Sequence, residues 1–275
     1  MKNLKMYCIS LEPSHLNFVK SLDYIPVGLS QKDFSEDWMR DNTGENISNK
    51  NKFYGEYTFH YWIWKNYIEK LGDGWIGFCQ YRKFWTAENH ENSKLDIKKL
   101  PSIVLKEIPK EYDDCEVILG KPFFINQIKP MKFIKKGSKI ILKNPQILFK
   151  KKLRNIKFHF DLMHGEGNLN KAIDLLDNKN KEDFKNYVNE MQYFHPQNMF
   201  ICKSKNLLEK YYETIFPWLE RCEKIFPAEK LKGYDFTRIY GFLAERFLSY
   251  WFQKNANCKT MDITFYDIRN DIKDI

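Results

Sequence analysis

The chain has 275 residues, of which 43% are hydrophobic and 16% aromatic; this composition excludes intrinsic disorder and suffices for one large domain. No run approaches the roughly 20 apolar residues of a membrane-spanning helix, and the apolar run at the N-terminus is too short for a signal peptide. The formal net charge is +9, and the six scattered cysteines form no C-x-x-C pair, which favours reduced thiols in the cytosol over a disulfide framework or a zinc site.

Short strands and one long helix are predicted in the first third of the chain. The first strand is expected at residues 4–9 and a second at 24–29, where Pro26 limits its length. A polar, turn-rich stretch then precedes a helix over residues 48–71, in which large apolar side chains recur three and four positions apart. The apolar run 75–81 indicates a buried strand.

In the rest of the chain, predicted strands and helices alternate less regularly, and helices dominate. We expect a strand at 115–119, a basic segment, helices at 169–176, 181–193, 206–226 and 235–252, and a last strand at 260–265. Pro217 is expected to break or kink the third of these helices. The pattern predicts a single α/β domain over residues 1–275, with a mainly parallel central sheet and a helical C-terminal half. In such sheets, ligands bind outside the carboxyl ends of the strands.

The basic segment, at about residues 127–157, is predicted to be an insertion in this domain. Eleven Lys or Arg residues and no Asp or Glu lie between positions 129 and 157, so the rest of the chain is close to neutral. Apolar residues alternate with these cations, which suits an anionic membrane surface, where each cation contributes about 1 kcal/mol. Nucleic acid and a solvated Lys-rich loop are the alternatives, and no nucleic-acid motif accompanies the segment. The cations expected at the membrane are Lys135, Lys136, Lys150, Lys151 and Lys152.

Two stretches predict a binding site. The first, DNTGENIS at residues 41–48, combines turn formers with candidate N-caps of the long helix, and such a helix N-terminus can hold a phosphate or a nucleoside. A helix that is merely capped is the alternative. The second, GFCQYRKFW at residues 77–85, leaves a buried strand with Arg82 and Lys83, whose charges suit phosphate oxygens. An exposed turn with chance cations is the alternative there.

Histidines and carboxylates later in the chain supply candidate acid–base groups. Asp161 lies in FHFDLMHGEG and His195 in YFHPQNMF. Arg238 and Glu245 lie seven positions apart on the last helix, opposite its apolar face, and periodicity leaves open whether they are solvated or line a cleft. The H-x-D-x-x-H spacing is a weak metal signal. The chain contains no P-loop, G-x-G-x-x-G or H-E-x-x-H motif, and no D-x-D triplet at a strand end.

Taken together, RDNTGENIS, GEYTFHYWIWKN, GFCQYRKF, NMFI and GFLAERFL resemble the bacterial family known as domain-of-unknown-function 4422, from Asp41 to about Phe252. Its members occur in capsular and exopolysaccharide gene clusters and are taken to be glycosyltransferases with a GT-A-like fold. Gln80 replaces the usual His of the family motif. The family's later H-x-x-x-D-L is partly met, because Asn168 stands where the acid is expected.

The resemblance implies a nucleotide-sugar donor, expected to be UDP-linked, and assigns roles to named residues. Where GT-A transferases carry a D-x-D metal site, this chain has Gln80-Tyr81-Arg82, so the cations are expected to neutralise the leaving diphosphate and no metal is expected to be required. The expected donor contacts are Asp41, Asn42, Asn46, Gln80, Arg82, Lys83 and Asp114. The expected catalytic base is Glu245, with His195 and Asp161 behind it.

The sequence thus predicts a cytoplasmic glycosyltransferase, peripheral at the inner face of the cell membrane. It would move a sugar to a growing capsular or surface polysaccharide, on a lipid-linked or oligosaccharide acceptor. A non-catalytic nucleotide- or glycan-binding module of a polysaccharide assembly complex is the alternative from another class. Nucleic acid is not expected as a partner.

Overall fold

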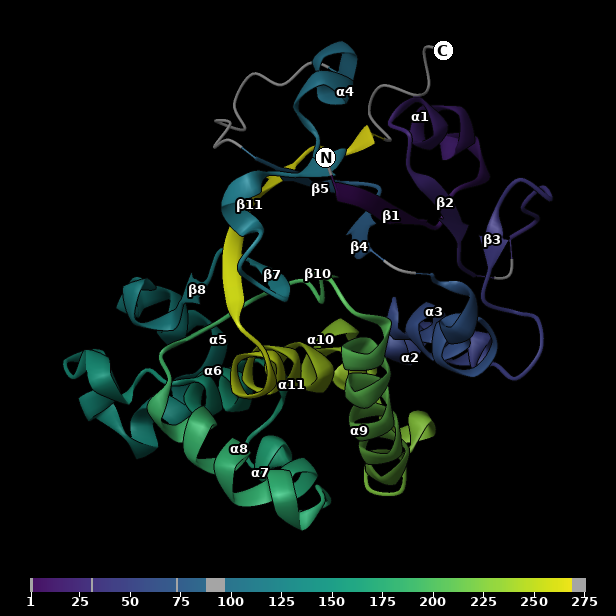
Figure 1. Ribbon diagram of the computed structural model, residues 1–275. Coiled ribbons are helices and arrows are strands. Elements are labelled where there is room, and N and C mark those ends of the chain that lie inside the picture. The colour runs from purple at the N-terminus through teal and green to yellow at the C-terminus, as the bar shows by residue number, and fades with distance from the viewer. Residues whose placement is uncertain (1, 31, 73, 88–96, 269–275) are drawn as a thin grey trace.

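A mixed sheet with helices on both faces forms the body of the molecule (Figure 1). The computed structural model describes residues 2–30, 32–72, 74–87 and 97–268, without the side chains at 2–3 and 135–139. The main sheet contains β1 (Lys2–Ser10), β2 (Ile25–Gly28), β3 (Met39–Arg40), β4 (Trp75–Gln80), β5 (Lys83–Thr86), β6 (Glu107–Ile108), β7 (Val117–Gly120), β10 (Phe200–Cys202) and β11 (Cys258–Phe265). A second, two-stranded sheet pairs β8 (Phe123–Phe124) with β9 (Tyr193–Phe194).

The helices are concentrated in the second half of the chain, as predicted. The first half contains α1 (Leu16–Ser21), α2 (Asn51–Tyr54), α3 (Tyr57–Trp62), α4 (Leu100–Ile103) and α5 (Pro130–Lys143). The second half contains α6 (Ile156–His164), α7 (Asn168–Ile173), α8 (Asn178–Glu190), α9 (Lys205–Glu223), α10 (Tyr234–Thr237) and α11 (Ile239–Asn255). Pro217 lies inside α9 and does not end it.

The prediction of a mainly parallel sheet is wrong, because the sheet is mixed. Strands β3, β2, β1 and β4 run parallel in that order, and β7 is parallel to β11. The pairs β1–β6, β4–β5, β4–β10, β7–β10 and β5–β11 are antiparallel. The chain reverses over Tyr81 and Arg82 directly after β4, so Gln80 pairs with Lys83. Since β10 pairs with both β4 and β7, the strands β4, β5, β11, β7 and β10 close into a ring.

Alternating side chains of β1 enter two separate hydrophobic clusters, one on each face of the sheet. Tyr7 and Ile9 belong to the larger cluster, which also contains the buried faces of α3, α9 and α11. Met6 and Cys8 belong to the smaller cluster, on the side of α1 and α4. This alternation of period two is the pattern of a strand that is buried on both faces. The layered arrangement is that of an α/β domain.

The helix predicted over residues 48–71 is interrupted. A 3-10 turn at Ser48–Lys50 leads into α2, which ends at Gly55, and α3 continues into a π-helical segment at Ile63–Tyr67. Gly55 has φ +61°, and a Cβ atom built there would lie 1.9 Å from Nη2 of Arg238. The backbone conformation therefore favours glycine at this position, and a larger residue would also displace the Arg238 guanidinium.

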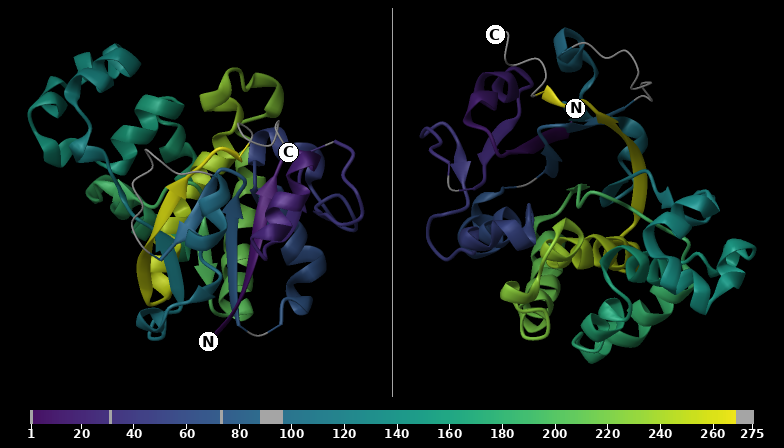
Figure 2. Two further views of the ribbon diagram at one scale, coloured as in Figure 1. Left: turned by 90° about the horizontal axis from the view of Figure 1, so that it is seen from above. Right: turned by 180° about the vertical axis from the view of Figure 1, so that it is seen from behind.

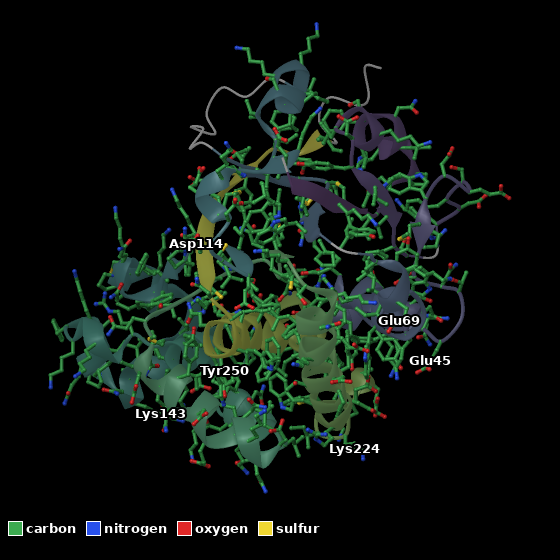
Figure 3. All side chains as sticks on the ribbon, in the orientation of Figure 1. Glu45, Glu69, Asp114, Lys143, Lys224 and Tyr250 are labelled. Atoms are coloured by element: carbon green, nitrogen blue, oxygen red, sulfur yellow. The ribbon has the colours of Figure 1, made fainter. Side chains whose placement is uncertain are left out.

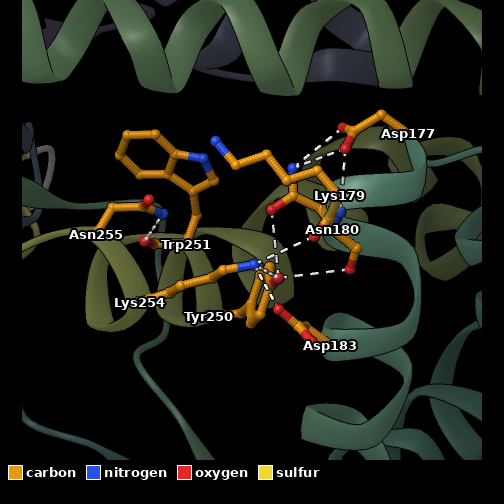
Figure 4. Close-up of polar contacts among 8 residues, drawn as sticks. All are labelled: Asp177, Lys179, Asn180, Asp183, Tyr250, Trp251, Lys254 and Asn255. Carbon is orange, nitrogen blue, oxygen red and sulfur yellow. Dashed lines mark hydrogen bonds and ion pairs between the residues drawn. The ribbon is translucent and has the colours of Figure 1, made fainter.

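A polar network fastens α8 to α11 (Figure 4). The Tyr250 hydroxyl accepts a bond from Lys254 Nζ over 3.0 Å and lies 3.4 Å from the carbonyl oxygen of Asn180. Lys254 also pairs with Asp183 at 2.5 Å, and Asp177 caps α8 by accepting from the Asn180 N–H at 3.0 Å. These bonds fix α11, which carries part of the site described below.

The basic segment at 127–157 is mostly helical, and it projects from the body of the molecule (teal in Figure 2). Phe133 and Ile141 of α5 are buried, and the buried Arg154 donates to the carbonyl oxygens of Ile147 and Leu148 at 2.9 and 2.7 Å. The segment is therefore a folded substructure rather than a loop. The side chains of Lys135 and Lys136 lie outside the described residues. Across the described part of the chain, no helix is long and apolar enough to cross a membrane.

Candidate functional site

Four parallel strands end at one edge of the sheet and align their C-terminal residues. Ser10 of β1 lies opposite Gly28 of β2, Gly28 lies opposite Arg40 of β3, and Ile9 lies opposite Gln80 of β4. Carboxyl ends of parallel strands are where α/β sheets bind ligands. The two-residue reversal after β4 keeps Arg82 at this edge.

Two adjoining hollows at this edge form a cleft. The first hollow, of about 430 Å³, is lined by Ile9, Leu11, Leu29, Asn51, Gly55 and Tyr81. The second hollow, of about 490 Å³, is lined by Lys83, Gln197, Asn198, Tyr234, Gly241, Phe242 and Glu245. Both are also lined by Glu56, Gln80, Arg82 and Arg238, so these four residues stand at the junction. The first hollow combines apolar side chains near the strand ends with polar ones, and the second is mostly polar.

The cations predicted from the sequence line this cleft. The Arg82 side chain is exposed, and within the described residues neither Arg82 nor Lys83 has a carboxylate partner within 4.0 Å. Burial lowers the pKa of the Lys83 ammonium; Glu56 and Glu245 oppose this shift, and Arg82 and Arg238 add to it. The two cations are therefore available to an anionic ligand.

Glu56, just before α3, joins three parts of the chain at the junction of the hollows. Its Oε1 accepts a hydrogen bond from Asn198 Nδ2 over 2.9 Å, and its Oε2 pairs with Arg238 Nη2 at 3.2 Å. Asn198 Nδ2 also donates to the Gly241 carbonyl oxygen over 3.1 Å. The start of α3, the segment before β10 and the start of α11 are thus tied together by one carboxylate.

Glu245 lies in the wall of the second hollow, with both carboxylate oxygens engaged. Oε1 accepts from the backbone N–H of Gln197, and Oε2 pairs with Arg246 Nη1. Arg246 is 2% exposed, and its guanidinium carbon lies 3.9 Å from the centre of the Phe194 ring. Periodicity had left the position of Glu245 and Arg238 open, and both line the cleft.

Gln197 and Asn198 form a left-handed turn that completes the wall. Their φ angles are +82° and +52°, a conformation that is uncommon outside glycine. Gln80 Nε2 donates to the Gln197 carbonyl oxygen over 3.2 Å, and Glu245 holds the Gln197 N–H. The strained turn is therefore held in place from both sides by site residues.

The loop at residues 41–48 is pinned to the helix that follows it. Trp62 Nε1 donates to the Thr43 carbonyl oxygen over 3.0 Å, while the Asn66 amide accepts from the Glu45 N–H and donates to the Glu45 carbonyl oxygen. Asn46 closes its own turn by accepting from the backbone N–H and the hydroxyl of Ser48. Asn42 is exposed, and neither asparagine is among the residues lining the two hollows.

Asp41 is completely buried at the end of β3. Neither carboxylate oxygen has a hydrogen-bond partner of ordinary geometry among the described residues. Burial raises the pKa of this carboxyl, and the Thr58 hydroxyl, the backbone and Arg40 act against that shift. Asp41 directly follows β3 and does not line either hollow, so the structure does not bring it together with Arg82 and Lys83 in the cleft.

Three other predicted site residues lie away from the cleft. Asp114 precedes β7, which runs in the same direction as β4, so it lies at the opposite edge of the sheet, where it pairs with Lys259 at the start of β11 (Figure 3). Asp161 pairs with Lys157 on α6 at 2.5 Å. The buried His195 bonds the Gly120 carbonyl oxygen through Nδ1 over 2.6 Å, and burial lowers its pKa. The cleft does not bring these three together with Arg82.

Glu56, Asn198 and Arg238 belong to the site but were not assigned to it from the sequence. Gly55-Glu56 was a usable signal, because a glycine within a helical pattern marks a backbone break. Asn198 was a weaker one, since asparagine tolerates the left-handed conformation better than most residues.

Carboxylates are the side chains of the cleft that could hold a divalent metal ion. Glu56 and Glu245 are the carboxylates among its described lining residues, and all four of their oxygens already accept an N–H. The described residues hold no group of three or more His, Cys, Asp or Glu that could bind a metal ion. The described lining of the cleft thus presents the cations Arg82 and Lys83, while both of its carboxylates are engaged with N–H groups.

The chain is similar in structure to a solved bifunctional glycosyltransferase, WbbM, in its apo form. The TM-score is 0.67 at 19% sequence identity, and the similarity covers 96% of this chain and 45% of that one. The chain thus spans less than half the length of that protein, and at this identity the likeness shows a shared fold. No curated protein sequence matches the chain.

A sequence family described as a domain of unknown function, DUF4422, matches residues 5–256. The match includes the loop at 41–48, the reversal after β4, the turn at 197–198 and all of α11. The chain therefore belongs to the DUF4422 family.

Proposed function

We propose that this protein is a glycosyltransferase that moves a sugar from a nucleotide-sugar donor to a glycan acceptor. The observation that carries the proposal is the convergence of Arg82 and Arg238 where two hollows meet, with Lys83 in the second hollow, at the carboxyl ends of four parallel strands. The fold around this cleft resembles that of a glycosyltransferase. An Arg fork and a Lys charge at such an edge suit a diphosphate.

The shape of the cleft supports this kind of donor. A nucleotide sugar consists of a nucleoside, a diphosphate and a sugar, in that order. The nucleoside would occupy the first hollow, between Ile9, Leu11 and Leu29, and the sugar would occupy the polar second hollow. The diphosphate would then lie between them at Arg82 and Arg238. The family resemblance favours a UDP-linked donor and a capsular or surface polysaccharide as the acceptor.

The cleft also supports the chemistry. Transfer forms a bond between the acceptor oxygen and C1 of the sugar and breaks the bond between C1 and the diphosphate oxygen. Negative charge accumulates on the leaving diphosphate, where Arg82, Lys83 and Arg238 would stabilise it without a metal ion. Cations that are already in place cost little reorganisation at the moment of transfer.

A nucleotide screen followed by a transfer assay tests the proposal. UDP is expected to raise the melting temperature more than GDP or CMP, and a matching sugar nucleotide should be consumed in the presence of oligosaccharide acceptors. Mass spectrometry of the acceptor would show the added sugar. The proposal fails if no nucleotide binds and no donor is turned over.

A non-catalytic nucleotide- or glycan-binding module is the second candidate. It is favoured by the engagement of both cleft carboxylates, Glu56 and Glu245, in hydrogen bonds and ion pairs. Such a module would bind UDP with the same stoichiometry and leave every sugar nucleotide intact. Binding without turnover across the donor and acceptor screen would select this candidate.

We further propose that the protein acts in the cytoplasm, at the inner face of the cell membrane, through the basic segment. Met131, Leu142 and Phe149 are 62%, 79% and 84% exposed, far above the exposure of ordinary core-forming residues. The exposed lysines 150–152 adjoin Phe149. Exposed apolar side chains among cations suit the headgroup region of an anionic bilayer.

A further inference from the structure

We propose that Glu56 is the catalytic base of this transferase and that Arg238 covers its carboxylate until the donor binds. The inference rests on the proposed function and concerns the same cleft. Glu56 lines both hollows, whereas Glu245, the base expected from the sequence, lines only the second among the described cleft residues. A base that serves an acceptor must lie beside C1 of the sugar, close to the diphosphate.

The partners of Glu245 show that it has a different task. The Gln197 N–H belongs to the backbone, and the Arg246 guanidinium is buried against the Phe194 ring. If Glu245 took up a proton, it would lose its negative charge. The buried Arg246 guanidinium would then be left without a counter-ion, which is costly. Glu245 therefore anchors the left-handed turn at Gln197 and Asn198 and is a positioning residue.

The partners of Glu56 differ in their freedom to move. Asn198 holds Oε1 at 2.9 Å and is itself fixed by the Gly241 carbonyl oxygen, so it orients the carboxylate. Arg238 holds Oε2 at 3.2 Å with a side chain that is 30% exposed, and it lies between α10 and α11. Only the Arg238 bond can therefore be exchanged without disturbing the core.

A diphosphate at the junction would compete for Arg238. It carries more negative charge than one carboxylate, and its oxygens match the two-pronged guanidinium. When Arg238 turns to the diphosphate, Oε2 of Glu56 is released toward the second hollow. The base then becomes available only after the donor has bound, which reduces exposure of an active base to water in the empty cleft.

In the proposed step, Glu56 Oε2 takes the proton of the acceptor hydroxyl. The oxygen of that hydroxyl forms the new bond to C1, and the bond from C1 to the diphosphate oxygen breaks with its electron pair on that oxygen. The resulting negative charge lies against Arg238, Arg82 and Lys83. The proton on Glu56 leaves to solvent after the nucleoside diphosphate dissociates, and Arg238 returns to the carboxylate.

Pyrophosphate binding tests the exchange of Arg238 without any turnover. Calorimetry would compare inorganic pyrophosphate affinity in the wild type, Glu56→Gln, Arg238→Gln and the double variant. Glu56→Gln is expected to tighten binding at least about threefold, because the pair with Arg238 no longer has to be broken. In the Arg238→Gln background, Glu56→Gln removes only the repulsion between the carboxylate and pyrophosphate. When Arg238 is present, the same change also removes the ion pair that pyrophosphate has to break, so the gain in affinity must be larger. Equal factors in both backgrounds would overturn the exchange.

Transfer rates test the role of Glu56 as base. Glu56→Gln keeps an acceptor for Asn198 and should lower transfer hundred- to ten-thousandfold while nucleotide affinity is retained. The exposed Glu220 provides the matched control, and Glu220→Gln should leave the rate unchanged. Azide, a nucleophile with no proton to lose, should restore turnover in Glu56→Ala and yield the glycosyl azide, which a structural role would not produce.

The outcomes separate this inference from the proposed function. If the wild type transfers sugar and Glu56→Gln remains within fivefold of it, Glu56 is not the base and the proposed function stands. If the wild type binds nucleotide but no donor is turned over, the proposed function fails and takes the base with it. Melting curves of both Glu56 variants confirm that any loss of rate comes from a folded protein.

Discussion

Arg82 and Lys83 are neighbours in sequence with different surroundings. Arg82 is exposed at the reversal after β4, with its guanidinium carbon 5.4 Å from the centre of the Tyr81 ring. Lys83 opens β5 and is partly buried, which lowers its pKa. The exposed fork can reach a diphosphate from either hollow, and the buried ammonium reinforces the local positive charge.

We expect Arg82→Ala to lower the rate of sugar transfer at least a hundredfold, because charge stabilisation at the leaving diphosphate is lost. The melting temperature should stay close to that of the wild type, since Arg82 is exposed. Initial rates and melting curves would be measured together, with Lys70→Ala as the control for loss of an exposed cation. Unchanged kinetics would remove Arg82 from the diphosphate site.

Asp41 illustrates the cost of burying a carboxyl group without a hydrogen-bond partner of ordinary geometry among the described residues. Its pKa is raised by burial in the folded state, so the folded protein binds the proton more tightly than the unfolded chain, whose Asp pKa is about 3.8. The stability contributed by the neutral carboxyl is present below that value and is lost as the pH rises through the raised pKa.

We therefore expect Asp41→Asn to raise the free energy of unfolding at pH 7. The difference from the wild type should shrink as the pH is lowered toward 3.8, because both side chains are then neutral. Urea unfolding of the two proteins at several pH values would measure it. A lower stability of the variant at pH 7 would indicate that the ionised carboxylate is well solvated or paired.

At the scale of elements, the basic segment presents its cations on a folded backbone. Phe133 and Ile141 anchor α5, and Arg154 closes the following turns through backbone carbonyl oxygens. Phe149 and the three lysines after it lie between these anchors and remain exposed. This geometry favours a surface contact over a disordered tail.

Neutralising Lys150, Lys151 and Lys152 with Gln is expected to weaken binding to anionic vesicles about a hundredfold, at roughly 1 kcal/mol for each charge. Co-sedimentation with vesicles of phosphatidylglycerol and phosphatidylcholine would measure this, while activity on a soluble acceptor should be retained. The control carries Gln at three exposed lysines outside the basic segment, Lys171, Lys179 and Lys185. Equal co-sedimentation of both variants would favour a solvated surface.

At the scale of the whole molecule, the charges of the cleft make a prediction about metal ions. Arg82, Lys83 and Arg238 provide the positive charge that a divalent ion would otherwise supply to the diphosphate. We expect transfer in excess EDTA to match transfer in Mg²⁺ or Mn²⁺ within about twofold. Complete loss of activity in EDTA, restored by either ion, would contradict the proposed charge stabilisation.

Local patterns predicted much of this molecule. The strands β1, β4 and β7 were recognisable as short apolar runs, and α7, α8, α9 and α11 followed from their apolar periodicity. The helix α6 was not predicted. The mixed direction of the sheet was not recognisable, because it depends on β5 and β10. Each of these strands has only three or four residues, and their partners are distant in sequence.

The candidate site, like the fold, was predictable from the sequence only in part. Gln80, Arg82 and Lys83 were predictable because one strand end presents all three. The contacts of Glu56 with Asn198 and Arg238 span 142 and 182 positions, which no local pattern reveals. Asp114 was placed wrongly beside the donor contacts because the sequence does not say which end of a strand faces them. It precedes β7, at the edge away from Gln80.

The closed ring of strands determines how this cleft can open. The walls at Gln80–Lys83 and at Gln197–Asn198 continue into β4 and β10, which share a hydrogen-bonded ladder at Gly77 and Ile201. These walls cannot move apart without breaking the sheet. The third wall begins at Arg238, between two helices, and Glu56 holds it through a single ion pair. Entry of the donor and release of the nucleoside diphosphate should therefore proceed by movement of the α10 side, while the strands remain in place.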